Sequence, residues 1–214
     1  MRLVIFGTGG MGREAADLAR RSDAVRGRYR AIVFAADSPD GPVDGLPVLA
    51  PDEIGQEDEL CLAIGSPAQR RSLAVRFGRH RFATVAAATA IISPSARIGA
   101  GALLCDYSVV NNGSAIGDHF QGNLFCQVSH DCVIGDFVTF APRVSCNGWV
   151  QIGADVFVGA GAVIRNGARD KPLRIGAGAV VGMGAVVVGD VAPGSVVLSP
   201  ATRQRSDAAE DAGG

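Results

Sequence analysis

One short segment of the chain carries residues that could take part in proton transfer, namely His130 and Asp131 in the sequence Ser-His-Asp-Cys. An imidazole with its ordinary pKa of about 6.5 is neutral at working pH, yet basic enough to accept a proton in a transition state. A carboxylate can orient such a base, but consecutive residues of a strand point to opposite faces. Asp131 can therefore reach the His130 ring only if the backbone turns there, and otherwise both are ordinary surface or packing residues.

A second candidate for chemistry is the glycine turn Gly7-Thr8-Gly9-Gly10 near the start of the chain. It follows a short apolar run and precedes a segment, REAADLARR, with the apolar spacing of a helix. Backbone N–H groups at such a turn and at a helix N-terminus can bind a phosphate. Gly7, Gly9 and Gly12 also meet the GxGxxG pattern, which is weak alone because it is common by chance. The alternative is a purely structural α/β cap.

The elements that must position these residues fall into two kinds of sequence. Apolar runs at 3–6, 31–34 and 60–64 alternate with helical patterns, which predicts a small parallel α/β domain of Rossmann-like type. An alanine-rich segment, 80–92, leads into a different pattern. We therefore expect an α/β domain at residues 1–86 and a second domain at residues 87–203. The polar segment 204–214 is expected to be a disordered tail.

The second domain is a repeat, because Ile-Gly pairs recur at one constant interval, beginning at Ile98, Ile116, Ile134 and Ile152. The interval equals three hexapeptides, and hexapeptides with an aliphatic residue followed by a small one are typical of an all-β left-handed parallel β-helix. The aliphatic side chains then point inward and stack about 4.8 Å apart, the spacing of paired strands. The next pair begins at Ile175 rather than at position 170, which predicts a loop bulging from the coil around Arg165–Pro172.

The composition limits the partners. The chain has 20 basic and 21 acidic residues, and no Lys/Arg block with interleaved aromatics marks a nucleic-acid surface, so we expect no nucleic acid. Five cysteines in no ligand-like spacing favour a reducing compartment and a cytoplasmic protein. The first apolar run is too short for a signal peptide, and no stretch approaches the roughly 20 residues that span a bilayer, so we expect no membrane span.

The repeat, the Gly-Thr-Gly-Gly turn and the segment VSHDCVIGDFVTFAPRVSCNG together resemble the NeuD/PglD-like family of sugar O- and N-acetyltransferases. The likeness spans nearly the whole chain. It implies an enzyme of glycan biosynthesis that transfers an acetyl group from acetyl-CoA to an amino group of a nucleotide-linked amino sugar. It also implies that the α/β domain holds the nucleotide, and that acetyl-CoA lies between neighbouring β-helices of a homotrimer.

The resemblance assigns roles to individual residues. His130 takes the place of the general base, Asp131 that of the carboxylate that orients it, and Asn123 that of a further polar residue near the active site. Gly148, one full repeat after His130, takes the place of the glycine whose N–H binds the acetyl carbonyl oxygen; ordinary turn residues are the alternative reading. The resemblance further implies cofactor binding by Gly161 and Gly182, and substrate binding by Gly7, Gly9, Gly10, Met11 and Asp37.

Three residues depart from the family pattern. Met11 replaces a usual histidine, Ala36 replaces the first acid of a usual pair, and Thr139 stands where some relatives carry a second histidine near the thioester. Nucleotide specificity is therefore open. Sialic acid O-acetylation is one alternative activity, and a non-catalytic scaffold or sugar-nucleotide sensor is another. The basic residues around the predicted loop, which are candidates for the CoA phosphates or simply solvated charges, are Arg165, Arg169, Lys171 and Arg174.

We expect no metal. Carbonic anhydrases of the same β-helix fold bind zinc through three histidines, whereas this β-helix contains only His119 and His130, and His80 lies in the other domain. We interpret His119 as a solvated turn residue, and the alternative is a residue near the acceptor.

Overall fold

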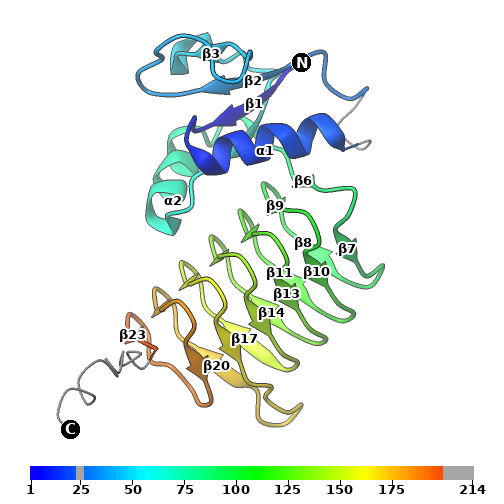
Figure 1. The fold of residues 1–214 in the computed structure, drawn as a ribbon, viewed down its shortest axis with the longest axis vertical. Coiled ribbons are helices and arrows are strands. Elements are labelled where there is room, and N and C mark those ends of the chain that lie inside the picture. The colour runs from blue at the N-terminus through cyan, green and yellow to red at the C-terminus, as the bar shows by residue number, and fades with distance from the viewer. Residues whose placement is uncertain (23–26, 200–214) are drawn as a thin grey trace, which may run out of the picture.

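The computed structural model describes residues 1–22 and 27–199, and Figure 1 shows them as a small α/β unit beside a long stack of coils. The expected disordered tail lies outside the described residues. Within them, the α/β unit forms one parallel five-stranded sheet in the order β3-β2-β1-β4-β5. Its elements are β1 (Leu3–Phe6), α1 (Gly10–Arg21), β2 (Ile32–Ala35), β3 (Val48–Leu49), the 3-10 helix η1 (Pro51–Glu53), β4 (Glu59–Leu62), α2 (Pro67–Arg76) and β5 (Arg81–Phe82).

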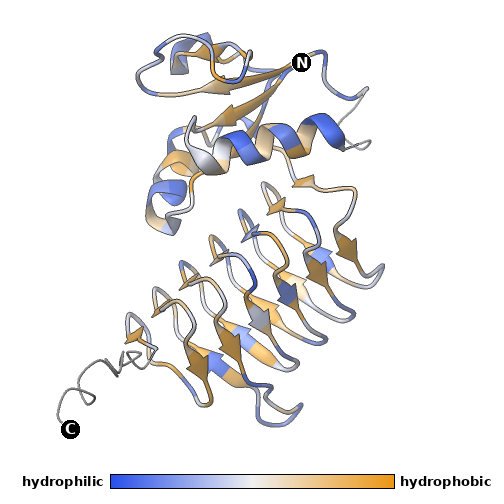
Figure 2. Cartoon of the chain, viewed as in Figure 1, coloured by the Kyte–Doolittle hydropathy of each residue, from blue (hydrophilic) through white to orange (hydrophobic). Residues whose placement is uncertain are grey.

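The two faces of this sheet carry separate cores because side chains alternate along each strand. Leu3 and Ile5 of β1 pack with the buried face of α1, while Val4 and Phe6 pack with residues from α2 and the turn after it. All four residues of β1 are buried, as expected for a central parallel strand covered on both sides. Figure 2 shows the sheet strands as hydrophobic and α1 as alternately hydrophilic and hydrophobic. The predicted α/β fold class is confirmed.

The second unit is a left-handed β-helix whose three flat faces are parallel sheets. We name each face by its first strand. The β6 face contains β6 (Val85–Ala86), β9 (Leu103–Leu104), β12 (Gln121–Gly122), β15 (Thr139–Phe140), β18 (Phe157–Val158), β21 (Val180–Val181) and β23 (Val196–Val197). The β7 face contains β7 (Ile91–Ile92), β10 (Val109–Val110), β13 (Gln127–Val128), β16 (Ser145–Cys146), β19 (Val163–Ile164) and β22 (Val186–Val187). The β8 face contains β8 (Arg97–Ile98), β11 (Ala115–Ile116), β14 (Val133–Ile134), β17 (Val150–Ile152) and β20 (Leu173–Ile175).

The predicted ladder of aliphatic residues forms the core of the β-helix. Ile116 pairs in register with Ile134, which pairs with Ile152 in the next coil, and all three are at most 5% exposed. In the following coil Ile152 pairs with Ile175, across a longer stretch of chain than separates the earlier pairs. The extra residues leave the coil between β19 and β20, which confirms the loop predicted around 165–172.

The α/β unit packs on the β6 face. Buried residues of α1 share one core with Val85 of β6 and Leu103 of β9. The last strand of the first sheet ends at Phe82, and β6 already pairs with β9 as part of the β-helix. We keep the division near residue 86 as a proposal for the domain boundary.

A buried arginine joins the two units. Arg70 of α2 is fully buried, and its guanidinium donates to the carbonyl oxygens of Ile64 (2.7 Å), His119 (2.9 Å) and Phe137 (2.7 Å). Loss of hydration lowers the pKa of Arg70 to about 10, which still leaves it protonated at neutral pH. Because the acceptors come from both units, this side chain fixes how α2 sits on the β-helix.

Candidate active site

His130 and Asp131 lie at the corner between β13 and β14, where the chain passes from the β7 face to the β8 face. Asp131 has a φ of 57°, so the backbone makes the turn that the sequence required for these neighbours to meet. The His130 Nδ1 lies 2.9 Å from the Asp131 Oδ2. The side chains are 47% and 35% exposed, so a solute can reach the imidazole.

Gly148 lies one coil further along the same corner. A Cβ added to it would be 2.6 Å from both Cε1 and Nε2 of His130, so only glycine lets the imidazole pack against this backbone. Gly148 is buried, and within residues 1–22 and 27–199 its N–H makes no backbone hydrogen bond. His130, Asp131 and Gly148 thus share one edge of the β-helix, which we call the His130 edge.

Trp149 is a residue of this edge that the sequence reasoning missed. Its indole lies 6.1 Å from the His130 ring, centroid to centroid, with the ring planes at 85°. The available signal was its position directly after Gly148 in a chain with a single tryptophan.

The other residues predicted for the acetyl transfer site lie on a different edge, between the β6 face and the β7 face. Asn123 follows β12, Gly161 follows β18 and Gly182 follows β21; we call this the Asn123 edge. Asn123 is only 6% exposed, and its N–H donates to Phe140 O. Within one chain these three residues are not brought to His130.

The prediction that His119 is solvated is wrong. His119 is 5% exposed, because Phe82 of the α/β unit and Phe137 of the next coil cover its ring at centroid distances of 4.5 and 4.7 Å. Burial lowers its pKa, and its Nδ1 has no hydrogen-bond partner among the described residues. No cluster of His, Cys, Asp and Glu side chains suited to a metal occurs in the described part of the chain.

Thr139 also belongs to the contact between the two units. It is 1% exposed; its hydroxyl accepts from Arg70 Nη2 at 2.9 Å and donates to Gly65 O at 2.9 Å. At this position, one of the three departures from the family pattern, the chain therefore has a residue that joins its own α2 to the β-helix.

The glycine turn lies at the carboxyl end of β1. Gly7 has a φ of 116°, and Gly9 is the N-cap of α1. A Cβ on Gly12 would lie 1.9 Å from Gly7 O, so this glycine is needed for the close packing of α1 on the turn. Met11 is partly buried against the core below α1. The N-terminus of α1, including Gly10, therefore points its free N–H groups out of the carboxyl edge of the sheet.

A hollow of about 480 Å³ opens at the same edge of the sheet. Asp37 follows β2 and its Oδ1 lies 2.5 Å from Arg76 Nη1 of α2. The strand order reverses beside β1, because β2 lies on one side of it and β4 on the other. Parallel α/β sheets bind ligands at such reversals. The residues that line the hollow are Phe6, Asp37, Ile64, Gln69, Ser72, Leu73 and Arg76.

A second hollow, of about 570 Å³, lies on the His130 edge beyond Gly148. Its wall includes Arg165, Lys171 and Asp190 together with the backbone of the loop between β19 and β20. Gly167, one of its wall residues, donates to Gly148 O at 2.9 Å, so the wall of the hollow adjoins the coil that carries Gly148. Arg169 and Arg174 are exposed but do not line it.

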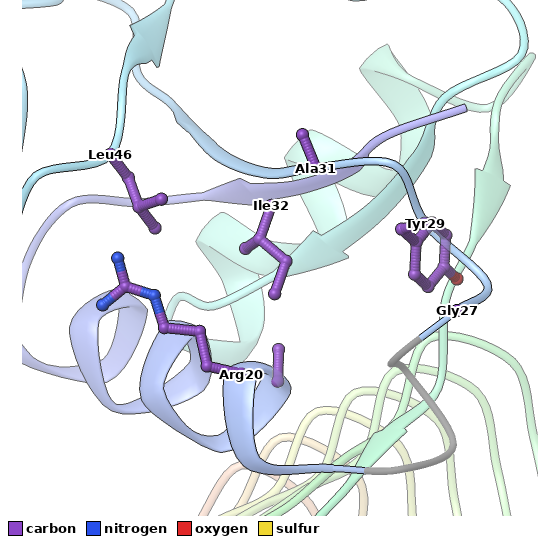
Figure 3. A pocket seen from close by; sticks show the side chains of 7 residues that line it. Arg20, Gly27, Tyr29, Ala31, Ile32 and Leu46 are labelled. Carbon is purple, nitrogen blue, oxygen red and sulfur yellow. The ribbon is translucent and has the colours of Figure 1, made fainter.

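A third hollow, of about 360 Å³, lies between α1 and the start of β2 (Figure 3). Tyr29 and Leu46 line it, and burial, followed by a hydrogen bond to Glu59, raises the pKa of the Tyr29 hydroxyl. It lies at the amino ends of the strands, away from both the glycine turn and His130.

Comparisons with known proteins agree with this architecture. Residues 2–77 match the family model for the PglD N-terminal domain. A GDP-perosamine N-acetyltransferase of Escherichia coli O157:H7 is 34% identical over 182 residues, which are 81% of this chain and 82% of that protein. Among solved structures, WeeI from Acinetobacter baumannii AYE is 34% identical with a TM-score of 0.86, covering 94% of this chain and 99% of that one. The acetyltransferase domain of PglB from Neisseria gonorrhoeae FA1090 in complex with acetyl coenzyme A is 30% identical with a TM-score of 0.83, covering 91% of this chain and 94% of that one.

The α/β unit followed by a left-handed β-helix, together with these relatives, identifies a hexapeptide-repeat acyltransferase. The chain belongs to the NeuD/PglD-like family of sugar acetyltransferases. None of its described helices is long and apolar enough to cross a membrane.

Proposed function

We propose that the protein transfers the acetyl group of acetyl-CoA to an amino group of a nucleotide-linked amino sugar. The observation that carries this proposal is the pair formed by His130 and Asp131, half exposed and packed against the backbone of Gly148. The identity to a GDP-perosamine N-acetyltransferase supports an amino group as the acceptor.

The proposed reaction is a direct attack that requires no acetyl-enzyme. With its proton on Nδ1 and donated to Asp131, His130 presents an unprotonated Nε2 that takes the proton of the acceptor amine. The amine nitrogen bonds to the thioester carbonyl carbon, and the Gly148 N–H donates to the oxygen that becomes negative. The C–S bond then breaks, and the CoA thiolate receives the proton from His130.

Acetyl-CoA is expected to lie along the His130 edge. The hollow beyond Gly148 has a volume of about 570 Å³, and two of its wall residues, Arg165 and Lys171, are cations. Cations of this kind attract phosphates such as those of CoA. Asp190 in the same wall accepts a hydrogen bond from the N–H of Arg174 at 2.8 Å.

The nucleotide is expected at the carboxyl edge of the α/β sheet. The N-terminus of α1, with Gly9 and Gly10, offers backbone N–H groups to a diphosphate. Asp37 and Arg76 offer a carboxylate and a guanidinium to the base or ribose in the neighbouring hollow.

A homotrimer would join these two parts of the site. The α/β unit packs on the β6 face, whereas the His130 edge lies between the other two faces, so nucleotide and base are on opposite sides of one chain. The β7 face connects the His130 edge to the Asn123 edge and exposes apolar side chains, among them Ile91 (63%) and Val186 (62%). Three copies with their β7 faces toward a common axis would cover these side chains and set the Asn123 edge of one copy beside the His130 edge of the next.

The first test is release of CoA thiol in the presence of UDP-, GDP- and dTDP-linked amino sugars and free sialic acid. We expect turnover with one amino sugar, and loss of about 10²–10⁴-fold in kcat for His130→Ala with retained CoA binding. Full activity of His130→Ala would exclude it as the base. Turnover of sialic acid alone would show that the acceptor group is a hydroxyl rather than an amine. Turnover of no acceptor would favour a non-catalytic sensor.

The state of the cysteines is consistent with a protein that works in the cytoplasm. All five are free and buried, as in a chain that matures under reducing conditions. We keep the cytoplasmic location as part of the proposal.

A further inference from the structure

Trp149 occupies a corner of the β-helix that suits small residues better. The corner positions one and two coils earlier on the same edge are Asp131 and Gly113, and all three have a positive φ, 58° for Trp149. The coil imposes this left-handed backbone on whatever residue stands there. Gly, Asn and Asp accept it most easily, whereas it is unfavourable for a bulky side chain. Tyr107 and Phe125 have the same backbone on the Asn123 edge, so the contacts of the indole, rather than its φ, decide what Trp149 does.

The indole lies directly beside the proposed base. Its ring is perpendicular to the imidazole of His130, at 6.1 Å between centroids, and the main-chain N–H of Trp149 donates to His130 O at 3.2 Å. The carbonyl of Trp149 accepts from Leu173 N at 3.1 Å, which ties the corner to the next coil. Trp149 is partly exposed, so part of this residue beside His130 is open to solvent.

Three neighbours then contact the imidazole. Asp131 lies within hydrogen-bond distance of Nδ1, the backbone of Gly148 packs against the ring, and the indole of Trp149 lies perpendicular to it. Perpendicular aromatic pairs are favourable and restrict rotation of both rings. Without the indole, the imidazole would keep its hydrogen bond to Asp131 but could rotate around that hydrogen bond.

We infer that Trp149 is a positioning residue for His130, which holds Nε2 toward the attacking atom of the acceptor. The inference deepens the proposed acetyl transfer and rests on it. A misplacement of a catalytic group by about 1 Å can cost as much as 100-fold in rate. Loss of the Trp149 indole should therefore lower kcat while the binding of acetyl-CoA is retained.

The test compares Trp149→Asn and Trp149→Phe with the wild type, on whichever acceptor the wild type turns over. Asn suits the left-handed backbone, so Trp149→Asn is expected to unfold at the same or a higher temperature, which removes misfolding as an explanation. We expect kcat of Trp149→Asn to fall about 10- to 100-fold with the KM for acetyl-CoA within about threefold of wild type. Trp149→Phe keeps an aromatic ring beside His130 and should therefore retain most of the wild-type kcat.

The control is Arg97→Asn, which removes a large exposed side chain from the β8 face, outside both the His130 edge and the Asn123 edge. It should leave kcat unchanged. Equal loss in Trp149→Asn and Arg97→Asn, or wild-type kcat in Trp149→Asn, would overturn the inference while leaving the acetyl transfer intact.

A measurement without substrate separates the inference from the proposed function. Trp149 is the single tryptophan, so the intrinsic emission of the protein reports on this corner alone. We expect His130→Asn to change the intensity of that emission in the absence of any ligand, since it removes the neighbouring ring. Identical emission would show that the two rings do not touch in solution and would overturn the inference even if the protein is an active acetyltransferase.

Discussion

The side chain of Arg70 in the α/β unit donates to the hydroxyl of Thr139 in the β-helix at 2.9 Å. The same guanidinium also donates to Phe137 O and His119 O, and the Thr139 hydroxyl in turn donates to Gly65 O. The hydrogen bonds of this network cross the boundary between the two units. The buried cation is therefore stabilised by carbonyl and hydroxyl oxygens. Because these acceptors belong to both units, the hydrogen bonds hold the two units in one relative position.

Arg70→Met should destabilise the protein strongly. The substitution leaves several buried carbonyl oxygens without donors, and each unpaired group costs about 1–3 kcal/mol. We expect the free energy of unfolding to fall by at least about 3 kcal/mol, measured by urea unfolding with far-UV circular dichroism. Arg71→Met is the matched control: Arg71 pairs with Asp155 at 2.7 Å, but the two side chains are 42% and 32% exposed, so the loss should stay below about 1 kcal/mol. Equal effects of the two substitutions would contradict the special role of Arg70.

The parts of the structure that depend on local pattern could be predicted from the sequence. Each Ile-Gly pair meets its counterpart one coil further on, so the constant spacing alone determined the coils, the inward ladder and the loop after β19. From the sequence, the contact between His130 and Asp131 could be predicted only on the condition that the backbone turns at this point. The turn depends on the left-handed φ of Asp131, which the sequence does not show.

The parts that depend on docking of the two units could not be predicted. His119 and Thr139 lie at positions that a β-helix alone would expose, and both are buried because α2 and Phe82 cover them. Trp149 was missed for a different reason. Its contact with His130 connects residues of two successive coils, and no motif that we considered contains both.

Asp131→Asn should lower activity without unfolding the corner. Asn accepts the left-handed backbone of this position, so the turn should form and the melting temperature should stay within a few degrees. The amide can no longer accept the Nδ1 proton with the strength of a carboxylate, so His130 loses part of its orientation and its preferred tautomer. We expect kcat to fall about 10- to 100-fold, less than the 10²–10⁴-fold expected on removal of the base itself. A rate equal to the wild type would show that Asp131 does not assist His130.

Gly148→Ala should act on the imidazole rather than on the fold. The new methyl group would lie 2.6 Å from the ring, and the half-exposed His130 side chain can move away from it. We expect the protein to fold, with kcat reduced by about 100-fold because the base is displaced. Gly78→Ala is the control, since its methyl group would approach only to 3.4 Å of backbone oxygens at the end of α2. Retained activity in Gly148→Ala would place the catalytic atoms elsewhere on the edge.

Acidification should weaken the contact between the two units through His119. Burial lowers the pKa of this imidazole in the folded protein, with a smaller opposing effect from Asp118. Between the lowered pKa and the unfolded value of about 6.5, the unfolded chain binds more protons than the folded one. Stability is therefore fully present above pH of about 6.5 and is lost progressively as the pH falls below it. The melting temperature of the wild type should drop more steeply between pH 7.5 and 5.5 than that of His119→Phe, which keeps a ring between Phe82 and Phe137 but cannot be protonated. Parallel pH profiles for the two proteins would show that His119 does not contribute to the acid sensitivity.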